Sequence, residues 1–348
     1  MLKQALERAA RQVTLAVVWA IAGGIFINGA LAQQSGPIEV RNGGMRGFLG
    51  MLKVSLARIQ DKHGVRYDNK IFNDATTTVL AMERGELEMG NVTAQHLIRA
   101  IDEGIPIVLV VGLGGGYNVL VAGSDVKVPQ GDMKALKGLI DERRRSGNKL
   151  KIGVPTGSQQ HLKLTHLLMG MGVNPEKDVD VVNIPFPGHP RALEGRHVDM
   201  TMAVAPFAAL MIQSGVGRLF HHVYGPGVGR WEVGYAVRKD LVEKNPDLVQ
   251  RIVSSHVEAL GSLMNDVSRQ VELEAQESSF PKPAIELVQR DFVKLTYRMS
   301  IADLKRTAKQ MYDVGWTKSD HSSKVESYVD FRFLEKATGE PRARLAEF

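Results

Sequence analysis

Apolar and polar residues follow two patterns along the chain. Short apolar runs predict strands, and apolar residues that recur every three to four positions predict helices between those strands. In the first part, strands are expected at 38–41, 65–72, 87–92 and 105–111, and helices at 49–64 and 75–84. Asn42-Gly43-Gly44 is expected to break the first strand. Strands that alternate with helices indicate parallel β-α-β units, and therefore an α/β fold.

The alternation then restarts. Strands are expected at 150–154, 178–184 and 198–204, with a turn at 155–158, a helix after it and a short helix at 191–194. Segment 81–89 aligns with 192–200 at a constant offset of 111, with three identical and three similar residues. Two α/β halves built on one plan would explain this weak repeat. From about residue 241 the chain is predicted to be mostly helical, with packing roles.

The first residues have the pattern of an export signal. Lys3, Arg8 and Arg11 precede an apolar run at 13–27, and Ala30-Leu31-Ala32 forms a small-residue cleavage site. The run is shorter than the roughly 20 residues that span a bilayer, which favours cleavage after Ala32 over an uncleaved anchor. We therefore expect a periplasmic mature chain of residues 33–348.

Composition removes several classes of function. The 348 residues include no cysteine, which excludes disulfides, thiolate metal sites, cysteine nucleophiles and a lipid anchor on cysteine. Without the signal the chain has 41 basic and 37 acidic residues, a net charge of +4 that does not indicate a nucleic-acid partner. Gly112–Gly116 lacks the Lys-Ser/Thr pair of a phosphate loop and is predicted to be a turn between strands. We predict no cofactor and no metal ion, because no histidine pair with metal-ligand spacing is present.

Several segments of the second half, in this order, resemble a known family. Lys151–Ser158, Gly172–Pro175 and Ala192–Gly195 are similar to the second lobe of periplasmic substrate-binding proteins of ABC importers, of the sulfonate, nitrate and taurine type. Gly104–Ile107 and Val237–Leu241 fit the same family. A longer link at 139–148 departs from its pattern.

The resemblance implies a type II-like periplasmic binding protein fold, with two α/β lobes joined by two crossover strands. Lobe 1 would comprise residues 33–122 and 235–348, and lobe 2 residues 123–234, with the crossings near 121–124 and 234–237. It also implies a small-molecule ligand between the lobes, an ABC permease as partner, and a monomer.

Turns at the carboxyl ends of strands are where ligands bind in open parallel sheets. Helices begin at these turns, and their free N–H groups suit an anion. The candidate ligand-binding residues are Asn42, Gly44, Arg46, Thr76, Thr77, Asn91, Thr93, Thr156, Gly157, Ser158, Gln159, His161, His189, Pro206 and Trp231.

Each of these candidates also has a purely structural interpretation. Thr156 or Ser158 would serve as an ordinary helix cap, and Asn91 and Thr93 would cap a loop. Arg46 and His189 would be solvated surface residues, and Trp231 would pack the hinge rather than cover a ligand.

The function expected is that of a binding protein that carries out no chemistry. A small, anionic organic solute would enter an open cleft, and the lobes would close on it and dock on the permease. The alternatives are an enzyme on the same fold, desulfinase-like or thiamin-precursor-forming, or an exported sensor domain. The missing cysteine weakens the enzyme alternative, since the resemblance implies a cysteine in those enzymes.

Overall fold

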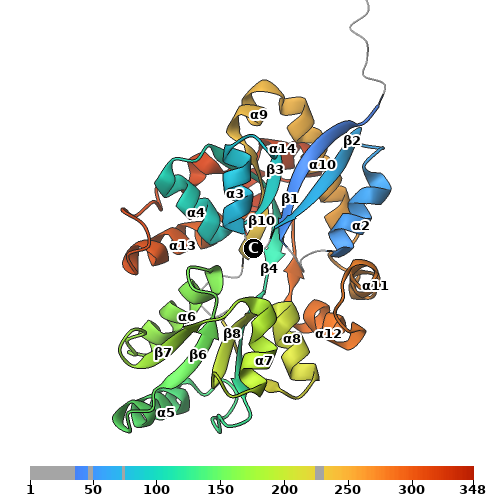
Figure 1. Ribbon diagram of the computed structural model, residues 1–348. Coiled ribbons are helices and arrows are strands. Elements are labelled where there is room, and N and C mark those ends of the chain that lie inside the picture. The colour runs from blue at the N-terminus through green and yellow to red at the C-terminus, as the bar shows by residue number, and fades with distance from the viewer. Residues whose placement is uncertain (1–35, 46–49, 73–74, 224–230) are drawn as a thin grey trace, which may run out of the picture. The chain divides into compact units, whose positions relative to one another are not determined.

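The computed structural model describes residues 36–45, 50–72, 75–223 and 231–348 (Figure 1). The predicted signal segment, its cleavage site and Arg46 lie outside the described residues.

Strands and helices alternate as predicted through the first two thirds of the chain, and the last third is mostly helical. The strands are β1 (Ile38–Met45), β2 (Val65–Phe72), β3 (Met89–Thr93), β4 (Ile107–Gly115), β5 (Asn118–Gly123), β6 (Leu150–Val154), β7 (Val179–Asn183), β8 (Met200–Val204), β9 (Gly217–His222), β10 (Trp231–Arg238) and β11 (Lys294–Leu295). The helices of the first two thirds are α2 (Gly50–Ile59), α3 (Ala75–Glu83), α4 (Ala94–Glu103), α5 (Met133–Arg145), α6 (Gln159–Gly170), η1 (Phe186–Gly188), α7 (His189–Glu194) and α8 (Ala205–Gln213). Those of the last third are α9 (Lys239–Lys244), α10 (Pro246–Gly261), α11 (Val267–Glu277), α12 (Lys282–Leu287), η2 (Val288–Phe292), α13 (Ile301–Asp313), η3 (Val325–Tyr328), α14 (Arg332–Thr338) and α15 (Arg342–Leu345).

The strands form two sheets with the same plan. The first has the order β11-β4-β10-β3-β1-β2 and the second the order β7-β6-β8-β5-β9. In each sheet three neighbouring strands are parallel (β2, β1, β3 and β7, β6, β8), and the next strand, β10 or β5, is antiparallel to them. The predicted repeat ends at the first residues of β3 and β8, which occupy equivalent places, and its aligned residues Gly85 and Arg196 both have positive φ (74° and 56°). The two halves are therefore built on one plan, as predicted.

The chain crosses from one sheet to the other between Gly115 and Asn118, and returns between His222 and Trp231. We call the elements of the first sheet and its helices lobe 1, and residues 118–222 lobe 2. The boundaries expected at 122/123 and 234/235 fall inside β5 and β10, each of which belongs entirely to one sheet. An apolar run indicates a buried strand, but it does not indicate which sheet the strand joins.

Two glycine-rich segments, one expected to break a strand and the other expected to be a turn between strands, continue strands instead. Residues 42–44 continue β1, and Gly112–Gly115 continue β4. Segment 292–298 lies directly on this end of β4: a Cβ atom on Gly112 would be 1.8 Å from the carbonyl oxygen of Arg298, and one on Gly114 would be 2.0 Å from that of Lys294. These glycines therefore permit close backbone approach rather than a turn.

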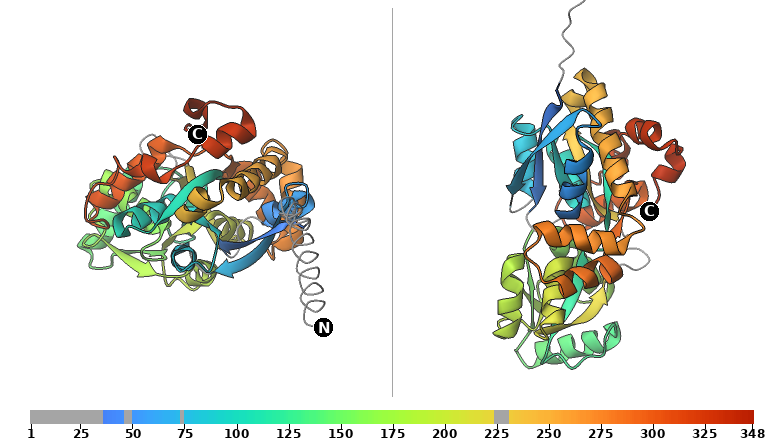
Figure 2. Two further views of the ribbon diagram at one scale, coloured as in Figure 1. Left: turned by 90° about the horizontal axis from the view of Figure 1, so that it is seen from above. Right: turned by 90° about the vertical axis from the view of Figure 1, so that its right-hand side faces the viewer.

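The C-terminal helices connect the two lobes on both sides. Helix α11 packs on α2 in lobe 1, and α12 packs on α8 in lobe 2. Figure 2 shows both helices, in orange, across the junction of the sheets. On the other side α13 contacts α4 and α6. The larger apolar core accordingly covers lobe 1 and continues into α8, whereas a smaller one fills the space between β6, α5 and α6.

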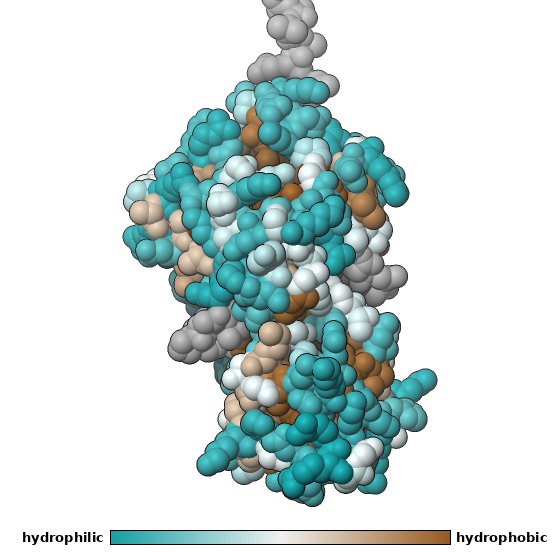
Figure 3. Space-filling model, turned by 90° about the vertical axis from the view of Figure 1, so that its left-hand side faces the viewer, coloured by the Kyte–Doolittle hydropathy of each residue, from teal (hydrophilic) through white to brown (hydrophobic). Residues whose placement is uncertain are grey.

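The surface in Figure 3 is mainly hydrophilic, with few brown apolar areas. Within the described ranges, no helix combines the length and the apolar character that crossing a bilayer requires.

Candidate functional site

Four helices begin at the carboxyl ends of strands near the junction of the lobes: α2 and α4 in lobe 1, and α6 and α8 in lobe 2. The turn before α6 follows β6 at Pro155. Gly157 in this turn has a φ of 76°, and Ser158 is the N-cap residue of α6. The Ser158 hydroxyl accepts the N–H of His161 (3.2 Å) and donates to the carbonyl of Pro155 (2.6 Å). This hydroxyl therefore serves the helix cap.

The starts of α4 and α6 are joined by Gln95, the second residue of α4. Its side-chain Nε2 donates to the carbonyl oxygen of Gly157 (2.7 Å), and its backbone N–H donates to Oε1 of Gln159 (3.2 Å). Both glutamines are buried. These bonds hold the two lobes together at the helix N-termini. Sequence reasoning proposed Gln159 and missed Gln95, although Gln95 lies only two residues after the strand end at Thr93.

Further along, α6 is fixed to lobe 1 by its charged and aromatic side chains. Nε2 of His166 lies 3.0 Å from the carbonyl oxygen of Gln310 in α13, and the rings of His161 and Trp316 are 5.1 Å apart. Lys163 is buried, and the carboxylates of Glu232 in β10 and Asp303 in α13 attract its ammonium group. Burial nevertheless lowers the pKa of Lys163. Sequence reasoning missed these three charged residues.

Several buried amide groups at this junction have no hydrogen-bond partner among the described residues. They are both polar atoms of the Asn91 side chain, Oε1 of Gln95 and Nε2 of Gln159. Asn91 is 2% exposed and lies in β3, the strand that leads into α4. An unsatisfied buried polar group costs about 1–3 kcal/mol. Water or a polar ligand at these atoms would remove that cost.

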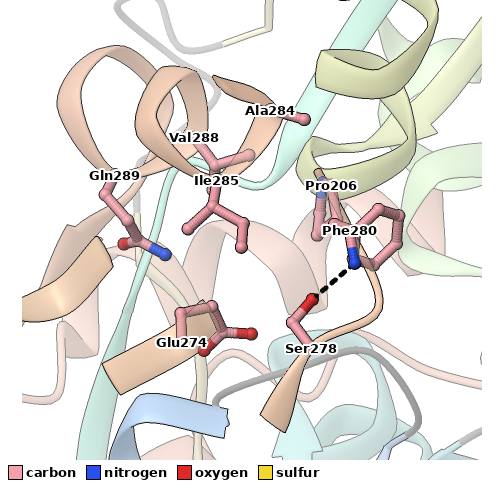
Figure 4. Close-up of a pocket in the computed structure, with 8 residues that line it drawn as sticks. All are labelled: Pro206, Glu274, Ser278, Phe280, Ala284, Ile285, Val288 and Gln289. Carbon is pink, nitrogen blue, oxygen red and sulfur yellow. Dashed lines mark hydrogen bonds between the residues drawn. The ribbon is translucent and has the colours of Figure 1, made fainter. Parts of the chain in front are cut away.

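A small pocket, partly open to solvent, lies between the N-terminus of α8 and helices α11, α12 and η2 (Figure 4). Its lining residues are Pro206, Glu274, Ser278, Phe280, Ala284, Ile285, Val288 and Gln289. Glu274 is buried and accepts the N–H of Met51 (2.9 Å) at the start of α2. Burial raises the pKa of this carboxyl group. Pro206 is the one predicted site residue in this lining.

The remaining candidates at the strand ends of lobe 1 lie in β1 and at the end of β3. Asn42 lies within β1 and donates to Oδ1 of Asn69 (2.8 Å). Gly44 is the second-last residue of β1 and is half-buried. Thr93 is the N-cap residue of α4, and its hydroxyl lies 2.7 Å from Nδ1 of His96.

Other candidates lie away from the amides at the junction or are open to solvent. Thr76 lines a separate small pocket between α3 and α4. Thr77 is exposed, as are Thr156 and Gly157 in the turn before α6.

Two candidates are buried and hold loops in place. His189 is fully buried, its Nε2 lies 2.9 Å from the carbonyl oxygen of Ile184, and burial lowers its pKa to about 4. The indole N–H of Trp231 donates to the carbonyl oxygen of Arg298 (2.8 Å), and its ring is buried. The structural interpretation of Trp231, packing at the return crossing, accounts for these contacts. The described residues contain no group of three or more histidine, aspartate or glutamate side chains that could hold a metal ion.

Comparison with known proteins assigns the chain to a family. Residues 56–272, more than half of the chain, match the model of the NMT1-like family. The chain belongs to the NMT1-like family. This NMT1-like chain is 25% identical over 202 residues to the taurine-binding periplasmic protein of Escherichia coli (strain K12). The alignment covers 56% of this chain and 57% of that protein, so the match spans little more than half of the relative's length.

Solved structures confirm the predicted two-lobed fold. The alkanesulfonate-binding protein SsuA from Xanthomonas axonopodis, bound to MOPS, superimposes with a TM-score of 0.68 at 17% sequence identity. That match covers 85% of this NMT1-like chain and 99% of SsuA. The desulfurization enzyme DSZB has the same fold, with a TM-score of 0.63 at 16% identity over 87% of this chain and 99% of the enzyme. The fold is therefore common to binding proteins and to an enzyme, and does not by itself decide between them.

Proposed function

We propose that this protein is the periplasmic solute-binding component of an ABC importer. It binds a small organic solute with an anionic head group, of the sulfonate, nitrate or carboxylate class, and its lobes close on that solute. The family, the names of the relatives and the export-signal pattern of residues 1–32 support this proposal. The closed form then docks as a monomer on a membrane permease.

The observation that carries the proposal is the pair of facing N-termini of α4 and α6 with unpartnered amides. Helix N-termini offer partial positive charge and N–H groups, which favour an anion. The side-chain amides of Asn91 and Gln159 supply further N–H donors that lack a partner among the described residues. A sulfonate or carboxylate that accepts these donors would satisfy groups whose burial is otherwise costly.

Because α4 and α6 belong to different lobes, the same contacts couple binding to closure. A solute between the two helices interacts fully only with the closed arrangement, and so shifts the population toward it. The desulfinase-like alternative requires a nucleophile, and the chain has no cysteine. Binding without turnover is therefore the function proposed.

Thermal unfolding of the chain 33–348 tests this proposal. The panel contains ethanesulfonate, taurine, nitrate, acetate and benzoate, with ethanol as an uncharged control. A bound solute present at 100 times its Kd adds about 2.7 kcal/mol of stability. We expect at least one anionic solute of the panel to stabilise the protein, and that solute to be recovered unaltered after incubation. A panel without any effect would contradict the solute class, and conversion of a bound solute would favour an enzyme.

Variants locate the site in the same assay. Gln159→Ala should weaken the binding of the stabilising solute. Gln213→Ala, at an exposed position at the end of α8, should leave that binding unchanged. Equal affinity in both variants would place the solute elsewhere.

A further inference from the structure

Three buried charged side chains lie where the chain crosses between the lobes. The first is Glu232, which is 1% exposed and is the second residue of β10, just after the return crossing. Its Oε2 accepts the backbone N–H of Tyr117 (2.9 Å), which lies in the outgoing crossing between β4 and β5. The carboxylate of Glu232 therefore ties the two crossing segments to each other.

The second carboxylate, that of Asp303, lies in the first turn of α13. It accepts the backbone N–H of Trp231 (3.0 Å), and so holds the first residue of β10. It also forms an ion pair with Arg306, three residues later in the same helix. Asp303 thus has a counter-charge within lobe 1.

The third charge comes from the other lobe. Lys163 of α6 is 2% exposed and lies one turn after Gln159, which bonds to α4. Helix α6 contacts α13 at the junction (Figure 1), and the carboxylates of Glu232 and Asp303 attract the ammonium group of Lys163. A buried ammonium group is strongly unfavourable without an opposite charge beside it. Because Asp303 already pairs with Arg306, Glu232 supplies the remaining negative charge.

We propose that Lys163 and Glu232 form a charge pair across the hinge that holds the lobes in the closed arrangement. Glu232 is anchored to both crossing segments, and Lys163 is part of α6, so their attraction draws α6 toward lobe 1. An opening rotation that moves α6 away from β10 separates the pair and returns both charges to water. Lys163 acts on a solute only through the position of α6, and is therefore a positioning residue. The pair acts in the chain without solute, so the inference does not depend on the proposed solute class.

A double-mutant cycle in the chain 33–348 without solute tests the inference. The variants are Lys163→Met, Glu232→Gln and both together, and Glu232→Gln keeps an oxygen acceptor for the N–H of Tyr117. Spin labels on Lys134→Cys in α5 and Glu243→Cys in α9, both at exposed positions, report the distance between the lobes. This distance distinguishes a positioning role from a merely structural one, which would change the stability and leave the distance unchanged.

The predicted result is an opening that the second substitution reverses. Lys163→Met leaves Glu232 buried without its cation, and we expect the ratio of open to closed forms to rise at least about tenfold. Glu232→Gln should give a smaller rise, because Asp303 still attracts Lys163. The double variant has neither charge, so its ratio should return to within about threefold of the parent, since buried pairs are often replaced by uncharged groups at little cost.

The control is Lys177→Met, which removes a lysine at an exposed position of lobe 2 and should leave the distances unchanged. Parent-like distances in Lys163→Met, or a double variant as open as Lys163→Met, would overturn the inference. If Lys163→Met does not fold, Glu232→Gln decides alone: more long distances than in the control would support the charge pair, and an unchanged distribution would contradict it.

Discussion

Replacing Gln95 with alanine tests whether the junction between the lobes is held as the structure indicates. The substitution removes the 2.7 Å bond from Nε2 to the carbonyl of Gly157, and keeps the backbone bond to Gln159. A typical hydrogen bond contributes about 0.5–1.5 kcal/mol net. Oε1 of Gln95 has no partner among the described residues, so its removal offsets part of that loss. We therefore expect the closed arrangement to become about two- to fivefold less populated relative to open forms.

Distance measurement between spin labels resolves this change. The chain has no cysteine, so Lys134→Cys in α5 and Glu243→Cys in α9 place two unique labels at exposed positions, one on each lobe. Gln95→Ala should enlarge the fraction of long interlobe distances, and Gln213→Ala at an exposed position of α8 should leave it unchanged. Identical distance distributions in the two variants would refute the reasoning.

Three further expectations concern stability, each measured by urea unfolding. Gly114→Ala should lower the free energy of unfolding by at least about 3 kcal/mol, because φ at Gly114 is 129° and the backbone of segment 294–295 leaves no space for a Cβ atom. Gly138→Ala in α5 should instead raise the free energy of unfolding by about 0.5–1 kcal/mol. Similar effects of both substitutions would contradict the close packing on β4. Arg196 is the one non-glycine residue in the described ranges with a positive φ, so Arg196→Gly should raise the free energy of unfolding by about 1 kcal/mol. Gly85→Ala, at the equivalent position, should lower it. A lower free energy of unfolding in Arg196→Gly would argue against backbone strain at this residue. Burial lowers the pKa of His256 to about 4, below the unfolded value near 6.5, so its contribution is complete above pH 6.5 and is lost as the pH falls toward 4, by up to about 3 kcal/mol. His256→Phe should flatten this pH dependence, and an unchanged slope would assign it to other groups.

Local patterns predicted the regular elements well. The strands 65–72 and 150–154 have the bounds expected from their sequences. Where prediction failed, the cause is contact with a segment distant in the sequence. Gly112–Gly115 have the composition of a turn, but they continue β4 because residues 294–298 pack on them. No local pattern contains that contact.

The candidate site, too, contains residues that local sequence patterns predicted and residues that they did not. The turns at the ends of β3 and β6 were predicted from the sequence. Of the predicted residues, Gln159 bonds to Gln95 and Pro206 lines the pocket beside α8. Gln95 and Lys163 act through partners in the other lobe, and a helical sequence pattern does not distinguish such residues from packing residues. Most of the pocket lining comes from residues 274–289, for which the sequence indicated packing alone.

A crystal structure of the chain grown with the best-binding anionic solute tests the central claim most directly. We predict that the head group of that solute lies between the N-termini of α4 and α6, within hydrogen-bond distance of the side-chain amide of Asn91 or Gln159. An unaltered solute at that place would agree with a binding protein. Solute bound outside the junction, or a reaction product in its place, would contradict the account.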